Sequence, residues 1–264
     1  MDRDAIASIR GAHREPGFGT MSVEDLVSIE GLIAAHRPAS FLEIGTASGL
    51  SAAVIAHMLE EHGGERLTTV DLLDHFYADP SREAGFVIPL AYPDGKVAVE
   101  RRTGWTAADV VAAGATYDMA LVDGGHVHPW PLIDTLCVNV VLTGPRLVLQ
   151  DDLTLFRRQP NGRGVGPKFL FDQFPESHRE VFTSGGGNLF AVSLDLPPER
   201  IERIALDAFA LPWTLTRKIP EDVVDKVQGV LDEHYSATLS QAFATCCATF
   251  NKPNGQYFRP RKSS

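Results

Sequence analysis

Residues 41–51 read Phe41-Leu42-Glu43-Ile44-Gly45-Thr46-Ala47-Ser48-Gly49-Leu50-Ser51. The apolar run at residues 40–44, bounded by Pro38 and Gly45, predicts a buried parallel strand. Small apolar residues over 51–59 predict a helix. A Gly-rich turn between the two lets a ligand approach bare main chain, and the free N–H groups of the helix start point outward. The stretch therefore predicts a strand–turn–helix unit that binds a nucleotide-like group.

The spacing of the two glycines separates two families of nucleotide-binding fold. A dinucleotide dehydrogenase would show G-x-G-x-x-G. Here three residues separate Gly45 from Gly49, and Glu43 stands two residues before the first glycine. This E-x-G-x-x-x-G arrangement resembles the first motif of class I S-adenosylmethionine-dependent methyltransferases; a structural turn in another α/β protein is the alternative. The resemblance implies that these residues bind the cofactor: Glu43, Gly45, Thr46, Ser48, Gly49 and Ser51.

Composition limits the other functional classes. With 264 residues, 44% of them hydrophobic, the chain suits one large domain, or one domain with an appendage. Its formal charge of −10 argues against a nonspecific nucleic-acid binder. It lacks an apolar run of about 18 residues and a secretory pattern at its start, so we expect no membrane span or signal. Three cysteines fit neither a disulfide framework nor a zinc site, which favours the cytoplasm: Cys137, Cys246 and Cys247.

Alternating strand and helix patterns follow the first unit. Further strands are predicted at residues 66–71, 96–102, 117–123 and 146–152. This alternation favours a parallel sheet with helices on both faces. Residues 180–182 and 189–194, joined by 184–188, predict an antiparallel hairpin. The fold expected is α/β: a Rossmann-like, seven-stranded, mostly parallel sheet ending in that hairpin, as in the methyltransferases.

The chain divides into three predicted parts. Residues 1–21 are expected to form an irregular N-terminal arm, and residues 22–197 the cofactor-binding domain, which begins with a helix capped by Ser22. Within the domain, a helix is predicted from Ser81. Residues 198–264 predict a helical C-terminal extension that serves oligomerisation or covers the substrate.

The ends of the second and third strands supply further cofactor candidates. Asp71 ends the second strand, where a carboxylate accepts hydrogen bonds from both hydroxyls of a ribose. The family resemblance implies that Thr103, Gly104 and Trp105 frame the adenine, with Trp105 stacking on the purine. A solvated strand end for Asp71 and a core position for Trp105 are the alternatives.

Acids also end the fourth and fifth strands. Because parallel strands end at one edge, Asp123, Asp151 and Asp152 are expected to share a crevice. Such concentrated negative charge is unfavourable without a cation or proton, so the three acids predict a site for Mg²⁺, or for Mn²⁺ or Ca²⁺. We also expect Asp123 to contact the cofactor. The alternative is that these acids are helix caps and solvated strand ends.

Two segments, 122–126 and 150–152, together resemble the metal site of cation-dependent O-methyltransferases, of the catechol type and of the macrocin and antibiotic-tailoring type. The resemblance covers about residues 22 to 195. Catechol-type enzymes carry a lysine general base three residues after the first acid, and here that position is His126. An imidazole with a pKa of ~6.5 accepts a proton at neutral pH. The alternatives are that His126 only orders the turn, or that His128 is the base.

The function predicted is transfer of a methyl group from S-adenosylmethionine to a hydroxyl of a small molecule: a phenol, catechol, sugar or secondary metabolite. We expect no nucleic-acid or membrane partner. We expect the chain to form a homodimer or a higher homo-oligomer. The alternatives are a metal-independent methyltransferase of this fold and a non-catalytic cofactor-binding or assembly protein. Four basic residues either meet an anionic substrate group or keep a loop soluble: Arg157, Arg158, Arg163 and Lys168.

Overall fold

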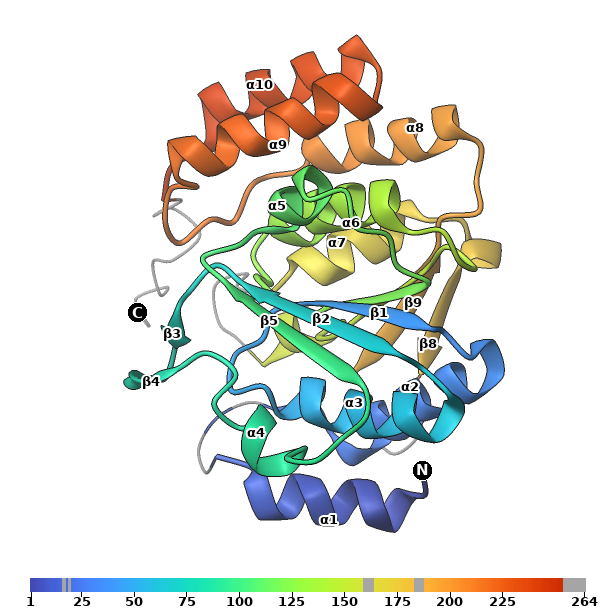
Figure 1. Ribbon diagram of the computed structural model, residues 1–264. Coiled ribbons are helices and arrows are strands. Elements are labelled where there is room, and N and C mark those ends of the chain that lie inside the picture. The colour runs from blue at the N-terminus through green and yellow to red at the C-terminus, as the bar shows by residue number, and fades with distance from the viewer. Residues whose placement is uncertain (16–17, 19, 159–163, 183–187, 254–264) are drawn as a thin grey trace, which may run out of the picture.

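A seven-stranded sheet forms the centre of the protein (Figure 1). The computed structural model describes residues 1–15, 18, 20–158, 164–182 and 188–253. The strand order is β5-β2-β1-β6-β7-β9-β8. The strands are β1 (Ser40–Ile44), β2 (Arg66–Asp71), β5 (Ala98–Thr103), β6 (Met119–Val122), β7 (Leu147–Gln150), β8 (Arg179–Phe182) and β9 (Leu189–Ser193).

From β5 to β7 in this strand order, neighbouring strands are parallel. In contrast, β9 pairs antiparallel with both β7 and β8. The predicted seven-stranded, mostly parallel sheet with a terminal antiparallel hairpin is thereby confirmed. Residues 184–187 of the predicted hairpin link, 184–188, lie outside the described residues.

Helices cover both faces of the sheet (Figure 1). One face carries α1 (Arg3–His13), α2 (Val23–His36), α3 (Leu50–His62) and α4 (Ile88–Ala91). The other carries α5 (Ala107–Ala112), α6 (Trp130–Val141) and α7 (Gly166–Gln173). Two short 3-10 turns are η1 (Leu155–Arg157) and η3 (Glu176–His178). Because both faces are covered, neighbouring residues of β1 are buried on opposite sides of the sheet, with Phe41 in one core and Leu42 in the other.

The C-terminal helices α8 (Pro198–Phe209), α9 (Glu221–His234) and α10 (Ala237–Phe250) lie over α5, α6 and α7 (Figure 1). Phe209, Trp213 and Phe243 are buried in the same core as sheet residues such as Leu42 and Val122. Lys226 Nζ contacts Asp109 Oδ1 at 2.8 Å, which ties α9 to α5. The extension therefore packs as a further layer on the domain.

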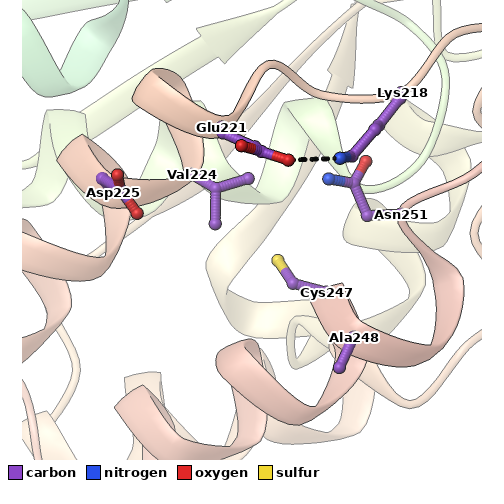
Figure 2. Close-up of a pocket in the computed structure, with 7 residues that line it drawn as sticks. All are labelled: Lys218, Glu221, Val224, Asp225, Cys247, Ala248 and Asn251. Atoms are coloured by element: carbon purple, nitrogen blue, oxygen red, sulfur yellow. Dashed lines mark hydrogen bonds and ion pairs between the residues drawn. The ribbon is translucent and has the colours of Figure 1, made fainter.

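A small pocket lies between α9 and α10 (Figure 2), and a Lys218–Glu221 ion pair of 2.8 Å crosses its rim. None of its lining residues belongs to the sheet or to the Gly-rich turn: Lys218, Glu221, Val224, Asp225, Cys247, Ala248 and Asn251. Within the described part of the chain, no helix has the length and apolar character that crossing a membrane requires.

Two local predictions were wrong. The N-terminal arm is helical over Arg3–His13, because Asp2 caps its first turn and Ile6 is completely buried against the domain. The expected helix from Ser81 is replaced by a two-stranded antiparallel sheet of β3 (His75–Phe76) and β4 (Asp79–Glu83). Asp79 Oδ1 accepts hydrogen bonds from the backbone and hydroxyl of Ser81, a local pattern that competes with helix formation.

Candidate active site

The Gly-rich turn joins the ends of three central strands. Gly45 N donates to Val70 O at 2.8 Å, and Asp123 N donates to Ile44 O at 2.8 Å. Gly45 has φ +105°, and a Cβ there would lie 2.2 Å from the backbone oxygen of Asp123. Only glycine fits this approach. Gly49, at φ +86°, is the N-cap of α3. The predicted strand–turn–helix unit is thus formed, with its turn directly beside the end of β6.

Asp71 binds the turn from the end of β2. Its Oδ2 accepts from the backbone N–H groups of Thr46 at 3.1 Å and Ala47 at 2.9 Å, and its Oδ1 accepts from Leu73 N at 2.9 Å. A carboxylate has roughly four acceptor positions, so capacity for a further donor remains on Oδ1. Asp71 therefore shapes the turn and keeps acceptor capacity for the ribose that the sequence predicted it to bind.

Glu43 lies beneath the turn. It is completely buried, and it accepts a hydrogen bond of 2.5 Å from Thr69 Oγ1, whose hydroxyl also contacts Thr46 Oγ1 at 2.7 Å. Burial raises the pKa of Glu43 to about 7, against the hydrogen bonds of Ser51 and Thr69, which lower it. Thr46 and Ser48 are also buried. These side chains form a polar layer under the main chain that a ligand would meet.

The residues after β5 lie against Asp71. Trp105 N donates to Asp71 O at 3.0 Å, and the guanidinium of Arg102 lies 5.1 Å from the centre of the Trp105 ring. The Trp105 ring is partly buried against the core around α5 and α6. Gly104 has φ +71° and open space where a Cβ would stand. Thr103 pairs with Asp71 in the β2–β5 register. All three predicted adenine-site residues thus lie beside the end of β2.

The acids that follow β6 and β7 meet around His126. His126 Nε2 lies 3.0 Å from Asp152 Oδ2 and 3.8 Å from Asp123 Oδ1. Asp152 adopts a left-handed backbone with φ +68°, a conformation that Asp tolerates better than most residues. Asp151 is 8% exposed, and its Oδ1 is buried with no hydrogen-bond partner among the described residues. The predicted base and the three predicted acids are therefore neighbours.

The electrostatics of this cluster favour a bound cation or proton. Burial raises the pKa of Asp123, and the charges of Asp151 and Asp152 raise it further. Burial and the Asp152 charge raise the pKa of Asp151 to about 8. Burial lowers the pKa of His126, against the opposing effect of Asp152. Buried carboxylates so close to one another repel unless positive charge or a proton is shared among them.

The donor set fits a hard divalent cation in its chemistry, because it consists of carboxylate oxygens and one of them is buried and unpartnered. Across the residues that the structure describes, no three His, Cys, Asp or Glu side chains converge closely enough to ligate a metal ion as they stand. His126 is within 4.0 Å of both Asp123 and Asp152. Metal binding would therefore require these side chains to rearrange around the ion.

Asn188, just before β9, is a site residue that sequence reasoning missed. Its Nδ2 donates to Asp152 Oδ1 at 2.7 Å, and its Oδ1 accepts from Thr154 N at 2.6 Å. Its backbone N–H donates to Asp25 Oδ1 at 2.7 Å, and Asp25 Oδ1 also accepts from Leu189 N at 3.0 Å. Asp25 and Asn188 are 163 residues apart, so no local pattern could have revealed this link.

We predict that Asp25→Ala lowers the free energy of unfolding by about 2–4 kcal/mol, because it removes the α2 capping partner of Ser22 and leaves two buried backbone N–H groups without an acceptor. Chemical denaturation monitored by circular dichroism measures the change. Glu24→Ala, at the partly exposed neighbouring position, is the matched control. A loss below about 0.5 kcal/mol for Asp25→Ala, the range of ordinary surface changes, would contradict the prediction.

The remaining residues that the sequence offered as site candidates lie away from the acids around His126. His128 is 1% exposed, its ring lies 5.4 Å from Phe169, and burial lowers its pKa to about 4. Its backbone pairs with Thr214 through two hydrogen bonds of 2.9 Å, so His128 holds the loop before α9 against the domain. Lys168 forms an ion pair with Asp172 one turn along α7. Arg163 lies outside the described residues.

Comparison with known proteins agrees with the fold. Residues 42–153 match the family model of a methyltransferase domain. The O-methyltransferase TomG from Streptomyces achromogenes, involved in tomaymycin synthesis and solved with SAM, is 20% identical, with a TM-score of 0.50 over 73% of this chain and 91% of that chain. Cofactor-bound Rv0187 from MTB is 16% identical, with a TM-score of 0.50 over 72% and 88%. No curated protein sequence matches the chain significantly.

The sheet order, the Gly-rich turn and the matched domain define the class I methyltransferase fold. Residues 42–153 match a methyltransferase domain, the class of protein that the E-x-G-x-x-x-G motif predicted.

Proposed function

We propose that this enzyme is a Mg²⁺-dependent O-methyltransferase that methylates a hydroxyl of a small molecule. The observation that carries the proposal is the meeting of His126 with Asp123 and Asp152, at 3.8 and 3.0 Å, beside the Gly-rich turn. A structural relative supports the type of reaction proposed, since TomG is an O-methyltransferase solved with SAM.

The cofactor would lie along the bare main chain of the turn. Gly45 and Gly49 give the turn its left-handed angles, φ +105° and +86°, and the remaining acceptor capacity of Asp71 Oδ1 suits a ribose hydroxyl. The partly exposed Trp105 ring is the candidate adenine contact. Thr46 and Ser51 support the turn through the layer around Glu43, and Ser48 is buried within the turn.

The carboxylates of Asp123, Asp151 and Asp152 would hold the metal ion. The buried, unpartnered Oδ1 of Asp151 and the mutual repulsion of the three acids are the features that fit a cation. When bound, Mg²⁺ lowers the pKa of an acceptor hydroxyl and orients its oxygen.

His126 would remove the proton of the acceptor hydroxyl. Asp152 Oδ2 lies 3.0 Å from Nε2, which selects the tautomer with hydrogen on Nε2 and leaves Nδ1 as the proton acceptor. As the O–H proton moves to Nδ1, the acceptor oxygen attacks the sulfonium methyl in line. The C–O bond forms, the C–S bond breaks, and S-adenosylhomocysteine leaves.

A metal-independent methyltransferase is the second candidate, and a specific contact favours it. The Asp152–His126 pair has the arrangement of a base oriented by a carboxylate, which can act without a metal ion. In that enzyme, Asp152 would stabilise the imidazolium that forms after proton transfer, and Asp123 and Asp151 would be structural.

Methyl transfer from radiolabelled S-adenosylmethionine to a panel of phenols, catechols, sugars and polyols tests the proposal, with EDTA-treated protein assayed before and after Mg²⁺ is restored. Product that requires Mg²⁺ supports the first candidate. Product in EDTA supports the second. Binding of cofactor without product on any acceptor would contradict both.

We predict that Asn188→Ala weakens divalent-metal binding by about 10–100-fold, because the hydrogen bond that fixes Asp152 is lost. Mn²⁺ binding followed by electron paramagnetic resonance measures the change without any turnover. Thr154→Ala is the matched control, since it removes a 2.7 Å hydrogen bond to Asn188 Oδ1 and leaves the Asn188–Asp152 contact intact. Equal Mn²⁺ affinity in Asn188→Ala and wild type would show that Asn188 does not position Asp152.

A further inference from the structure

β5 is an outer strand of the sheet: β2 pairs with one side of it, and among the described residues no strand pairs with the other side (Figure 1). Ala98 N donates to Glu65 O at 2.9 Å, so the backbone groups of Ala98 point toward β2. Because this direction alternates along a strand, the N–H and C=O groups of Val99, Arg101 and Thr103 point outward. β5 therefore offers a backbone edge on which another strand can pair.

The side chains of β5 divide between the two faces of the sheet. Val99 packs against the core on the α3 side, and Arg101 lines the same groove as Val99. Glu100 and Arg102 point to the opposite face, where the Arg102 guanidinium lies 5.1 Å from the centre of the Trp105 ring. These two residues form an ion pair, and their side chains are 43% and 45% exposed. An accessible acid and an accessible base thus lie two residues apart on one face of an outer strand.

We propose that β5 is the contact strand of a homodimer, in which two copies of this chain pair their sheets edge to edge. The two strands run antiparallel about a two-fold axis between their Arg101 residues. Glu100 of each copy then lies opposite Arg102 of the other, and opposite residues of an antiparallel pair share a face. Val99 of each copy lies opposite Thr103 of the other, so about six backbone hydrogen bonds join the strands.

The two-fold axis also brings the Arg101 side chains of the two copies together. Arg101 Nη2 lies 2.8 Å from Glu83 Oε2, and its Nη1 donates to Ala84 O at 2.8 Å. The Glu83 side chain is 75% exposed, and a carboxylate has roughly four acceptor positions, so it can also meet the guanidinium of the second copy. In each copy, two acids therefore balance two bases at the contact: Glu83 and Glu100 against Arg101 and Arg102.

A groove of about 500 Å³ adjoins β5 on the face of Val99 and Arg101. Phe86, Ile88 and Pro89 supply its apolar lining. In the dimer, the Arg101 side chain of the second copy lies beside this groove. Its alkyl stem packs on the apolar lining while its charged end reaches Glu83, which adds buried apolar area to the paired backbone.

The order of charges distinguishes β5 from an outer strand that keeps other chains away. Charged residues on an exposed strand protect it when they repel an approaching copy. On β5 the acid and the base exchange partners across the two-fold axis, so they attract. The outer strand at the other end of the sheet, β8, lacks this complementarity. Within β8, antiparallel pairing of two copies on a shared face places Glu180 opposite Glu180 or opposite Phe182.

Sedimentation equilibrium of the full chain tests the dimer and its charge pairing. We expect the wild type to be dimeric at about 10 μM. Glu100→Arg places like charges opposite each other and should weaken dimerisation on the order of 10-fold. The charge exchange Glu100→Arg/Arg102→Glu should restore the affinity to within about 3-fold of wild type. Glu180→Arg makes the same charge change on β8, is the matched control, and should dimerise as wild type.

Cysteine substitutions test the register of the two strands. Hydrogen-bonded residues of an antiparallel pair have Cα atoms about 5.5 Å apart, within the range of about 4.4–6.8 Å that a disulfide spans. Arg101→Cys should therefore form a disulfide between copies on oxidation. Thr103→Cys, which lies opposite Val99, should cross-link no more than the wild-type protein does through its own cysteines.

Any of four results would overturn the proposal. They are a monomeric wild type at up to about 100 μM, unchanged dimerisation in folded Glu100→Arg, no recovery in the charge exchange, and equal cross-linking of Thr103→Cys and Arg101→Cys. Circular dichroism of each variant checks its fold, and the cysteine pair tests the contact even if a charge variant fails to fold. None of these measurements depends on methyl transfer, so their outcome is independent of the proposed function.

Discussion

Replacing Asp151 and Asp152 together with asparagine is expected to lower Mg²⁺-dependent methyl transfer at least about 1,000-fold, because it removes two of the three carboxylates proposed to hold the ion. The same change relieves charge repulsion, since the neighbouring acids add to the effect of burial in raising the pKa of Asp123 and Asp151. The double variant should therefore melt at or above the wild-type temperature. A lost activity could not then be ascribed to unfolding.

Steady-state turnover and thermal melting of the same samples measure these two effects. Asp195→Asn/Glu199→Gln removes two exposed acidic charges after β9 and is the matched control for net charge. Wild-type turnover in Asp151→Asn/Asp152→Asn would remove the metal assignment and leave the metal-independent candidate.

His126→Ala is expected to reduce turnover at least about 100-fold while affinity for S-adenosylhomocysteine changes little, because the proton acceptor is lost and the Gly-rich turn is untouched. The fold of the loop should survive, since the His126 carbonyl, which the substitution keeps, accepts the hydrogen bond of 3.0 Å from Gly166 N. Turnover together with calorimetric cofactor binding separates the two effects.

His126→Gln distinguishes proton transfer from an ordering role. The glutamine amide can still donate to Asp152 Oδ2 but cannot serve as a base at neutral pH. Turnover as low as that of His126→Ala supports the base. Recovery to near the wild-type rate in His126→Gln would show that the side chain only orders the turn beside Asp123.

The sequence predicted the sheet well because its central strands are buried on both faces and therefore read as continuous apolar runs. Phe41 and Leu42 enter opposite cores, yet both positions demand apolar residues. The acidic ends of β6 and β7 followed from the same reasoning, since parallel strands bring their carboxyl ends to one edge. Their meeting with His126 could thus be anticipated before any geometry was available.

Contacts between distant segments could not be predicted in this way. Asn188 supports Asp152 only because β9 folds back beside β7, and Asp25 reaches Asn188 from another helix. The β3–β4 hairpin depends on the burial of Phe76 against Phe86 and Phe18, which local propensity does not reveal. Asp71 illustrates an intermediate case: its place at the strand end was predicted, but its bonds to Thr46 and Ala47 were not.

The most direct test of the proposed enzyme is calorimetric titration of S-adenosylhomocysteine, and then Mg²⁺, into chelator-treated protein. We predict saturable cofactor binding followed by a Mg²⁺ signal, with only the Mg²⁺ signal lost in Asp151→Asn/Asp152→Asn. The Mg²⁺ titration is repeated with 2,3-dihydroxynaphthalene, a catechol-like diol, present. This second titration detects an ion that binds only when acceptor oxygens complete its ligands. Cofactor binding with no Mg²⁺ signal in either titration would contradict the metal-dependent mechanism, and the absence of cofactor binding to the wild-type protein would contradict the methyltransferase assignment itself.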